Sequence, residues 1–244
     1  SRLHQLGLPC QLLEQREVPS DHSRAIGVHP PSLELLERVG VIEAFLARGL
    51  KVPGGVAMGD RRRLGRLSFE GLPGPYPFAL ALPQQETEII LERRLRQLNP
   101  GALRRGITVE QIRPGRSAVE VLARDRAGAP LRLTTSLLVG CDGKDSLVRQ
   151  AAGILYDGKP YPDAYVMGDF DDNTDFGADA RLFLTGRGIV ESFPLPGGIR
   201  RWVMRLGAYK KQPELASFCR EIRRRTGHEL AGVPNHMLGP FGIQ

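Results

Sequence analysis

The stretch LLVGCDGKDSLVRQAAGI (residues 137–154) joins an apolar run, a Cys-Asp-Gly turn and the start of a basic helix. The apolar residues predict a parallel strand that ends just before Asp142, and a helix is expected from Ser146 onward. Ligands bind α/β sheets beyond the carboxyl ends of such strands. The stretch is therefore either an ordinary strand-to-helix connection or a turn that contacts a cofactor, and the rest of the chain must decide.

The turn carries suitable chemistry at three positions. Gly143 permits a backbone conformation that a side chain would block. The carboxylate of Asp142 can accept hydrogen bonds from a hydroxyl group. Arg149 leaves the start of the helix and can meet a phosphate. An isolated Asp-Gly pair is uninformative, but with a strand before it and a helix after it the pattern favours a cofactor contact.

Composition excludes several classes of protein. The chain has 244 residues, 41% hydrophobic and 25% charged, which indicates a globular chain of one large or two small domains. No apolar stretch approaches the ~18 residues of a membrane span, and no signal peptide is visible, so we expect a cytoplasmic protein. The three cysteines and five histidines lack metal-ligand spacing, so we expect neither a disulfide framework nor a metal.

The net charge of +7 raises the question of nucleic acid. The basic runs at 61–63 and 223–225 lack interleaved aromatic residues and match no nucleic-acid-binding motif. We interpret them as solvated faces and expect no nucleic-acid partner. The same positive field would favour an anionic small ligand.

Two kinds of pattern alternate along the chain. Residues 1–50 and 84–153 are α/β in character, and residues 51–83 and 154–244 are typical of antiparallel β structure. The α/β part is expected to hold a helix at 1–7, a strand at 9–15, a long helix at 32–49 capped by Ser32, a helix at 84–98 and a three-stranded meander from 107. The β part holds four strand candidates, YVMGDF, ARLFLTG, GIVESFPLP and IRRWVMRL, and then a helix at 212–227. This alternation predicts one domain inserted into another, with a ligand cleft between them.

Three residues outside the opening stretch could also serve a nucleotide. Glu14 ends a strand, where an acid can accept hydrogen bonds from ribose hydroxyls. Arg24 lies in a loop ten residues later, and its guanidinium can pair with a pyrophosphate. Gln84, at the start of a helix, can offer its amide to a ring or ribose, or can simply cap the helix. Taken singly, Glu14 and Arg24 are ordinary surface residues.

Together these segments resemble a known family. Glu14, SRAIGVHPPSLELLERVGV (23–41), LPQQETEIILERRL (82–95) and GCDGKDSLVRQAAGI (140–154) occur in the order and spacing of the single-component FAD-dependent aromatic hydroxylases, which include para-hydroxybenzoate hydroxylase and polyketide hydroxylases. The resemblance implies a mixed α/β fold. An incomplete FAD-binding domain of glutathione-reductase type (1–50 and 84–153) would be interleaved with an antiparallel β-sheet substrate domain (51–83 and 154–244). The strands of that sheet would form the floor of the substrate pocket.

The resemblance also implies an activity. It makes Glu14 the ribose contact, Arg24 and Gln84 FAD contacts, and Asp142 with Gly143 a motif that serves both FAD and NAD(P)H; Arg149 lies in the same segment. The expected protein is an oxidoreductase, a flavoprotein monooxygenase that hydroxylates a small aromatic or polyketide-like molecule. It would use FAD, NAD(P)H and O2 through a C4a-hydroperoxyflavin. The family has no universal side-chain base, so no catalytic residue is assigned.

The chain departs from the family at both ends. It lacks the GxGxxG motif and the GDAAH-like segment, so we expect the middle of a longer enzyme that binds FAD poorly as it stands. A halogenase is disfavoured, because Trp202 is the one tryptophan and WxWxI is absent. A flavin-free binding module, or an inactive fragment, stays open as the alternative. The aromatic residues of the β part (Phe170, Phe183, Phe193 and Trp202) could line a pocket, but core packing is favoured for each.

Overall fold

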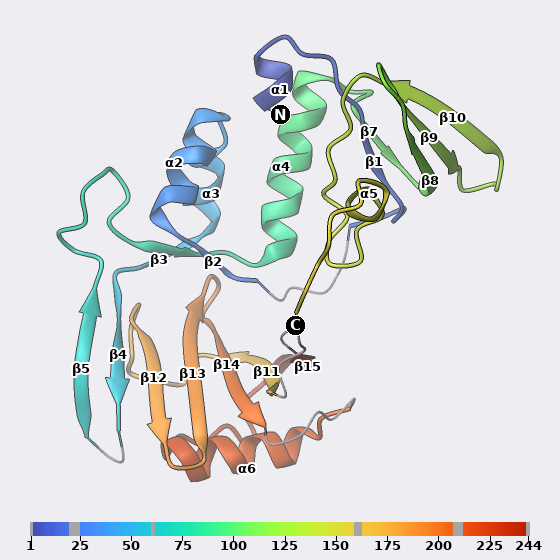
Figure 1. Cartoon of the computed structure of the whole chain (residues 1–244). Coiled ribbons are helices and arrows are strands. Elements are labelled where there is room, and N and C mark those ends of the chain that lie inside the picture. Colours follow the sequence, from blue (N-terminus) through green and yellow to red (C-terminus); the bar gives the residue numbers. More distant parts are fainter. Residues whose placement is uncertain (1, 20–24, 60–61, 159–162, 207–211, 243–244) are drawn as a thin grey trace. The chain divides into compact units, whose positions relative to one another are not determined.

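The computed structural model describes residues 2–19, 25–59, 62–158, 163–206 and 212–242 (Figure 1). The chain forms two compact units. One contains residues 1–21 and 91–158, and the other contains residues 22–90 and 159–244. None of the helices in the described ranges is long and apolar enough to cross a membrane.

The first unit combines a parallel strand pair with an antiparallel meander. Strand β1 (Leu12–Glu14) pairs in parallel with β7 (Leu103–Arg105), which places Glu14 opposite Arg105. The predicted meander is confirmed: β8 (Thr108–Pro114), β9 (Val119–Arg124) and β10 (Pro130–Thr135) form a sheet in the order β10-β9-β8. The unit also holds α1 (Arg2–Gln5), α5 (Leu147–Ala151) and the second half of α4 (Gln84–Leu98).

The predicted parallel strand before Asp142 is wrong. Residues 137–143 have no regular secondary structure, and Leu137 and Val139 are 75% and 64% exposed. A strand exists only where a neighbour completes its hydrogen-bond ladder. In the described part of this unit the parallel ladder consists of β1 and β7, and no strand pairs with the apolar run. Among the described residues, no neighbouring strand is therefore available to pair with the apolar run.

The second unit is built on a seven-stranded sheet in the order β15-β11-β14-β13-β12-β4-β5. The four predicted strands are confirmed as β11 (Ala164–Asp171), β12 (Ala180–Thr185), β13 (Gly188–Leu195) and β14 (Ile199–Leu206). Strand β15 (Asn235–Gly242) extends one edge of the sheet, and β4 (Gly54–Met58) with β5 (Arg63–Ser68) extends the other. The β4–β12 pairing is parallel, so the sheet is not wholly antiparallel as expected.

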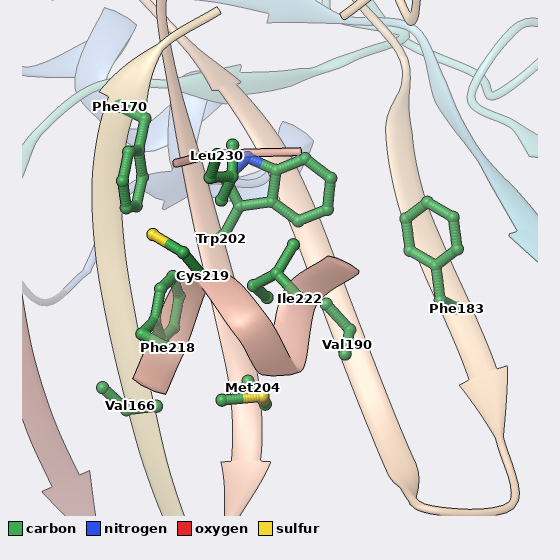
Figure 2. Packing of buried hydrophobic residues seen from close by; sticks show 10 residues of the cluster. All are labelled: Val166, Phe170, Phe183, Val190, Trp202, Met204, Phe218, Cys219, Ile222 and Leu230. Atoms are coloured by element: carbon green, nitrogen blue, oxygen red, sulfur yellow. The ribbon is translucent and has the colours of Figure 1, made fainter. Parts of the chain in front are cut away.

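Helix α6 (Leu215–Thr226) confirms the predicted helix and covers one face of this sheet. Figure 2 shows the buried side chains between them: strand residues Val166, Phe170, Phe183, Val190, Trp202 and Met204, and Phe218, Cys219, Ile222 and Leu230 from α6 and beyond. Three of the aromatic residues considered for a pocket are thus core residues. Successive strand residues face opposite sides of a sheet, so the intervening residues occupy the face away from α6.

The helix expected at 32–49 is divided in two. Helix α2 (Pro30–Arg38) and α3 (Ile42–Arg48) are separated at Gly40, whose φ of 74° ends the first helix. The predicted Ser32 cap is also wrong, because α2 begins at Pro30 after His29 and has no side-chain cap. Proline suits the first positions of a helix, where no N–H partner is needed.

A small three-stranded sheet completes the second unit. It contains β2 (Gly27–Val28), β6 (Ala79–Ala81) and β3 (Leu50–Val52) in that order. Residues 22–50 thus share a compact unit with the large sheet, whereas residues 1–50 were expected to belong to the cofactor domain. The compact units do not show which ligand each segment binds. The predicted division into an FAD-binding domain and a substrate-binding domain therefore stays a prediction.

Candidate functional site

Asp142 caps the short helix α5. Its Oδ2 accepts hydrogen bonds from the backbone N–H of Leu147 (2.6 Å) and of Val148 (3.2 Å), and its Oδ1 accepts one from the Ser146 hydroxyl (2.5 Å). The first N–H groups of a helix have no intrahelical partner, and a carboxylate placed there satisfies them. The Cys-Asp-Gly turn is thus held against the helix that follows it.

Ser146 completes the cap and helps to set the charge of Asp142. Its Oγ accepts the N–H of Arg149 at 3.0 Å while its hydroxyl donates to Asp142. The Ser146 hydrogen bond, opposed by slight desolvation and aided by backbone N–H groups, holds the pKa of the exposed Asp142 below its ordinary value. An ionised carboxylate can accept about four hydrogen bonds. Asp142 therefore keeps capacity for a hydroxyl of a bound cofactor.

Two glycines in this segment are needed for different reasons. Gly143 has a φ of 80°, and a Cβ there would meet no atom within 4 Å, so its conformation and not its size is required. A Cβ on Gly140 would lie 2.7 Å from Val148 Cβ and 3.1 Å from Asp142 Oδ1. Gly140 is therefore needed for close packing of the turn against α5.

Replacing Gly140 with alanine is expected to lower the free energy of unfolding by about 1–3 kcal/mol, because the new methyl overlaps Val148. Urea denaturation measures the change. Gly158→Ala is the matched control, since its new Cβ meets nothing within 4 Å and its φ is not in the left-handed region. Equal effects of the two substitutions would contradict the packing role of Gly140.

Arg149 already has partners within the turn. Its Nη1 donates to the carbonyl of Lys144 at 2.6 Å, and its guanidinium lies over the Tyr156 ring at 4.6 Å from the centroid. A guanidinium carries five N–H donors in a planar fork, so these contacts leave donors for a phosphate. Its predicted phosphate contact stays a prediction.

Glu14 lies at the carboxyl end of β1 and is half-buried. Its Oε1 accepts the N–H of Arg16 at 2.8 Å, and its Oε2 makes no hydrogen bond to any residue that the structure describes. Opposite it, Arg105 donates to Glu92 of α4 at 2.6 Å, and this hydrogen bond lowers the pKa of Glu92. The open Oε2 suits the predicted ribose contact. Arg105 and Glu92 were not found from the sequence, because the β1–β7 register was unknown.

Gln84 lies in the second unit, at the start of α4. Its Nε2 donates to Glu88 at 2.9 Å, and its Oε1 accepts the N–H of Ala25 at 3.5 Å. The amide thus connects the helix start to the segment that follows Arg24, and Arg24 itself lies outside the described residues. The structure brings Asp142, Gly143 and Arg149 together in one turn, with Glu14 in the same unit. Their cofactor roles stay predictions.

Within the described ranges, no three His, Cys, Asp or Glu side chains are grouped so as to hold a metal ion. The acidic and basic groups of the turn are arranged for hydrogen bonding instead. A carboxylate with spare capacity, a glycine with open space above it and a guanidinium with unused donors suit a ligand that carries hydroxyl and phosphate groups.

Comparison with known proteins agrees with this chemistry. The chain is 36% identical over 170 residues to the uncharacterized aromatic compound monooxygenase YhjG of Bacillus subtilis, covering 69% of this chain and 33% of that protein. It is 32% identical over 226 residues to 6-methylpretetramide 4-monooxygenase of Streptomyces rimosus, covering 91% of this chain and 39% of that protein. The chain thus spans between about a third and two fifths of the length of these relatives.

A solved structure shows the same fold. The OxyS anhydrotetracycline hydroxylase from Streptomyces rimosus matches with a TM-score of 0.71 and 28% identity, covering 98% of this chain and 48% of that one. Residues 1–219 match the model of the FAD binding domain family. The chain therefore belongs to the FAD binding domain family, among the FAD-dependent aromatic hydroxylases.

Proposed function

We propose that this chain is the core of a flavoprotein monooxygenase that hydroxylates an aromatic or polyketide-like small molecule. The observation that carries the proposal is the family match over residues 1–219, which includes every predicted cofactor residue. In the proposed reaction one atom of O2 enters a ring C–H bond as a hydroxyl group. The other oxygen atom is reduced to water, for which NAD(P)H provides a hydride and the solvent provides a proton, and NAD(P)+ is formed. The need for NAD(P)H favours the cytoplasm as its location.

The residues present fit FAD, which when bound would supply the oxygen activation that side chains cannot. Glu14 would accept a hydrogen bond from a ribose hydroxyl at Oε2. Asp142 would accept a hydrogen bond from a further cofactor hydroxyl beside the α5 cap. The open space above Gly143 lets the cofactor approach the backbone. Arg149, with Arg24 and Gln84, would hold phosphate and ring groups.

The activity is tested by incubating the full-length protein with FAD, NAD(P)H and a panel of phenols and polycyclic polyketides. We expect substrate-dependent NAD(P)H oxidation, and a product that mass spectrometry finds heavier by one oxygen atom. Omitting FAD is the control and should abolish both signals. Aromatic binding without flavin binding or oxidation would contradict the proposal and support the flavin-free module instead.

A further inference from the structure

Glu191 occupies the face of the large sheet that α6 does not cover. Its neighbours along β13, Val190 and Ser192, are fully buried on the α6 side, where Val190 packs beside Trp202 and Met204 (Figure 2). Because strand side chains alternate between faces, the Glu191 side chain projects from the opposite face. It comes from the centre of the sheet, since β13 has two or more strands on either side.

The cross-strand neighbours of Glu191 are apolar. The register places Val203 of β14 on one side and Leu182 of β12 on the other. Val203 is 8% exposed, and Leu182 packs against the cluster of Val52, Ala81, Ala180 and Leu195. The two cross-strand neighbours of Glu191 therefore offer no hydrogen-bond partner to its carboxyl group.

No charged partner compensates Glu191 within the described residues. Its carboxyl makes no hydrogen bond and no ion pair there, and burial raises its pKa. Two cations of β14 share this face, and each has its own aspartate: Arg201 donates to Asp169 at 2.6 and 2.8 Å, and Arg205 donates to Asp163 at 2.7 Å. Glu191 is half-buried, and a half-buried carboxyl group without a partner costs free energy that a leucine at this position would avoid. A group kept at such a cost is a candidate for ligand contact.

We propose that the Glu191 carboxyl binds a phenolic hydroxyl of the aromatic substrate. The assignment rests on the proposed function, and on the expectation that the strands of this sheet form the floor of the substrate pocket. A neutral phenol suits the site, because it donates a hydrogen bond and brings no second charge into apolar surroundings. An aromatic carboxylate would be disfavoured, because two acidic groups would then share the site.

Isothermal titration calorimetry with matched probes tests this assignment. In the full-length protein, 2-naphthol should bind about tenfold more tightly than 2-methoxynaphthalene, which cannot donate the hydrogen bond, and 2-naphthoate should bind most weakly. Glu191→Leu should reduce the preference for 2-naphthol to about twofold or less and improve binding of 2-naphthoate. Glu191→Gln, which keeps the shape, should give an intermediate preference.

Stability measurements separate this role from a structural one. The midpoint of thermal unfolding should stay unchanged or rise in Glu191→Leu, because an uncompensated carboxyl has been removed. Glu110→Gln is the control, since Glu110 is an exposed strand residue paired with Arg124, and it should change neither binding nor the midpoint.

Either of two results would overturn the proposal: no preference for 2-naphthol in the wild type, or a wild-type preference in folded Glu191→Leu. If that variant does not fold, an undiminished preference in Glu191→Gln overturns it. Failure of the proposed function is a different outcome. Selective 2-naphthol binding without FAD-dependent oxidation would contradict the proposed monooxygenase function but would still support Glu191 as a ligand contact.

Discussion

Replacing Asp172 with alanine is expected to lower the free energy of unfolding by about 3–5 kcal/mol, because it leaves the Arg200 guanidinium buried without its counter-ion. The Arg200 side chain is fully buried, and its Nε donates to Asp172 Oδ2 at 2.8 Å. Its Nη2 donates to the carbonyl of Gly177 at 2.7 Å. The carbonyl bond survives the substitution, but it cannot neutralise the charge.

The same pair predicts a loss of stability in acid. Burial alone would raise the pKa of Asp172, but hydrogen bonds from Thr174 and Arg200 outweigh it and hold the pKa below its ordinary value. A depressed pKa contributes stability that is fully present above the ordinary Asp pKa of about 3.9 and is lost as the pH falls through the folded-state pKa. The Asp172→Ala protein should lack this part of the acid dependence.

Urea denaturation of matched variants measures the effect. Asp171→Ala is the control, because Asp171 pairs with His236 at 2.7 Å with both side chains about half exposed, and such pairs contribute about 0–1 kcal/mol. The double variant Asp172→Ala, Arg200→Met should recover much of the lost stability by removing the buried charge. If Asp172→Ala lowers the free energy of unfolding no more than Asp171→Ala does, the buried pair of Asp172 and Arg200 does not contribute the expected stability.

The second large effect is expected at Asp142. Asp142→Ala removes the hydrogen bonds to Leu147, Val148 and Ser146 and should lower the free energy of unfolding by about 1–2 kcal/mol, as the loss of a helix cap does. It should also weaken FAD binding by about tenfold or more, because a charged acceptor for a cofactor hydroxyl is lost. Urea denaturation and FAD titration of the full-length protein measure the two effects.

Two further variants separate the cap from the cofactor contact. Ser146→Ala weakens the cap but leaves the Asp142 carboxylate, so it should lose stability with little change in FAD affinity. Asp145→Ala removes an exposed neighbour that pairs with Lys144 and should change neither quantity. If Ser146→Ala weakens FAD binding as much as Asp142→Ala, then Asp142 acts through the cap alone.

Much of the fold could be predicted because its elements have strong local signals. Helix α4 begins and ends where its pattern and the following Asn-Pro-Gly predict, at Gln84 and Leu98. The break at Gly40 was missed, because apolar spacing continues through it while the backbone does not. The strand before Asp142 was predicted from composition, but a strand also depends on a partner that composition does not reveal.

Burial of charge could not be predicted either. Arg200 and Arg201 are 0% and 1% exposed, although consecutive arginines usually indicate a solvated surface. They point to opposite faces of the sheet, and each meets an aspartate on the β11 strand or just after it. Only the β11–β14 register, which places Asp169 opposite Arg201, brings these residues together.

The candidate site was predictable to the extent that it is local. Asp142, Gly143 and Ser146 lie within a few residues, so their spacing nearly determines the geometry of the cap. The pairing of Glu14 with Arg105, and the apolar surroundings of Glu191, depend on strands far apart in the sequence. The cofactor was predicted from the resemblance to a family. From the turn alone, helix capping would have been the simpler explanation for Asp142.

The central claim is that residues 1–219 form part of a protein that binds FAD. A titration of the full-length protein with FAD, followed by the visible absorbance of the flavin, tests it most directly. We expect saturable binding with a shifted flavin spectrum, weakened in Asp142→Ala and unchanged in Asp145→Ala. A folded protein that leaves the spectrum of free FAD unaltered would contradict it.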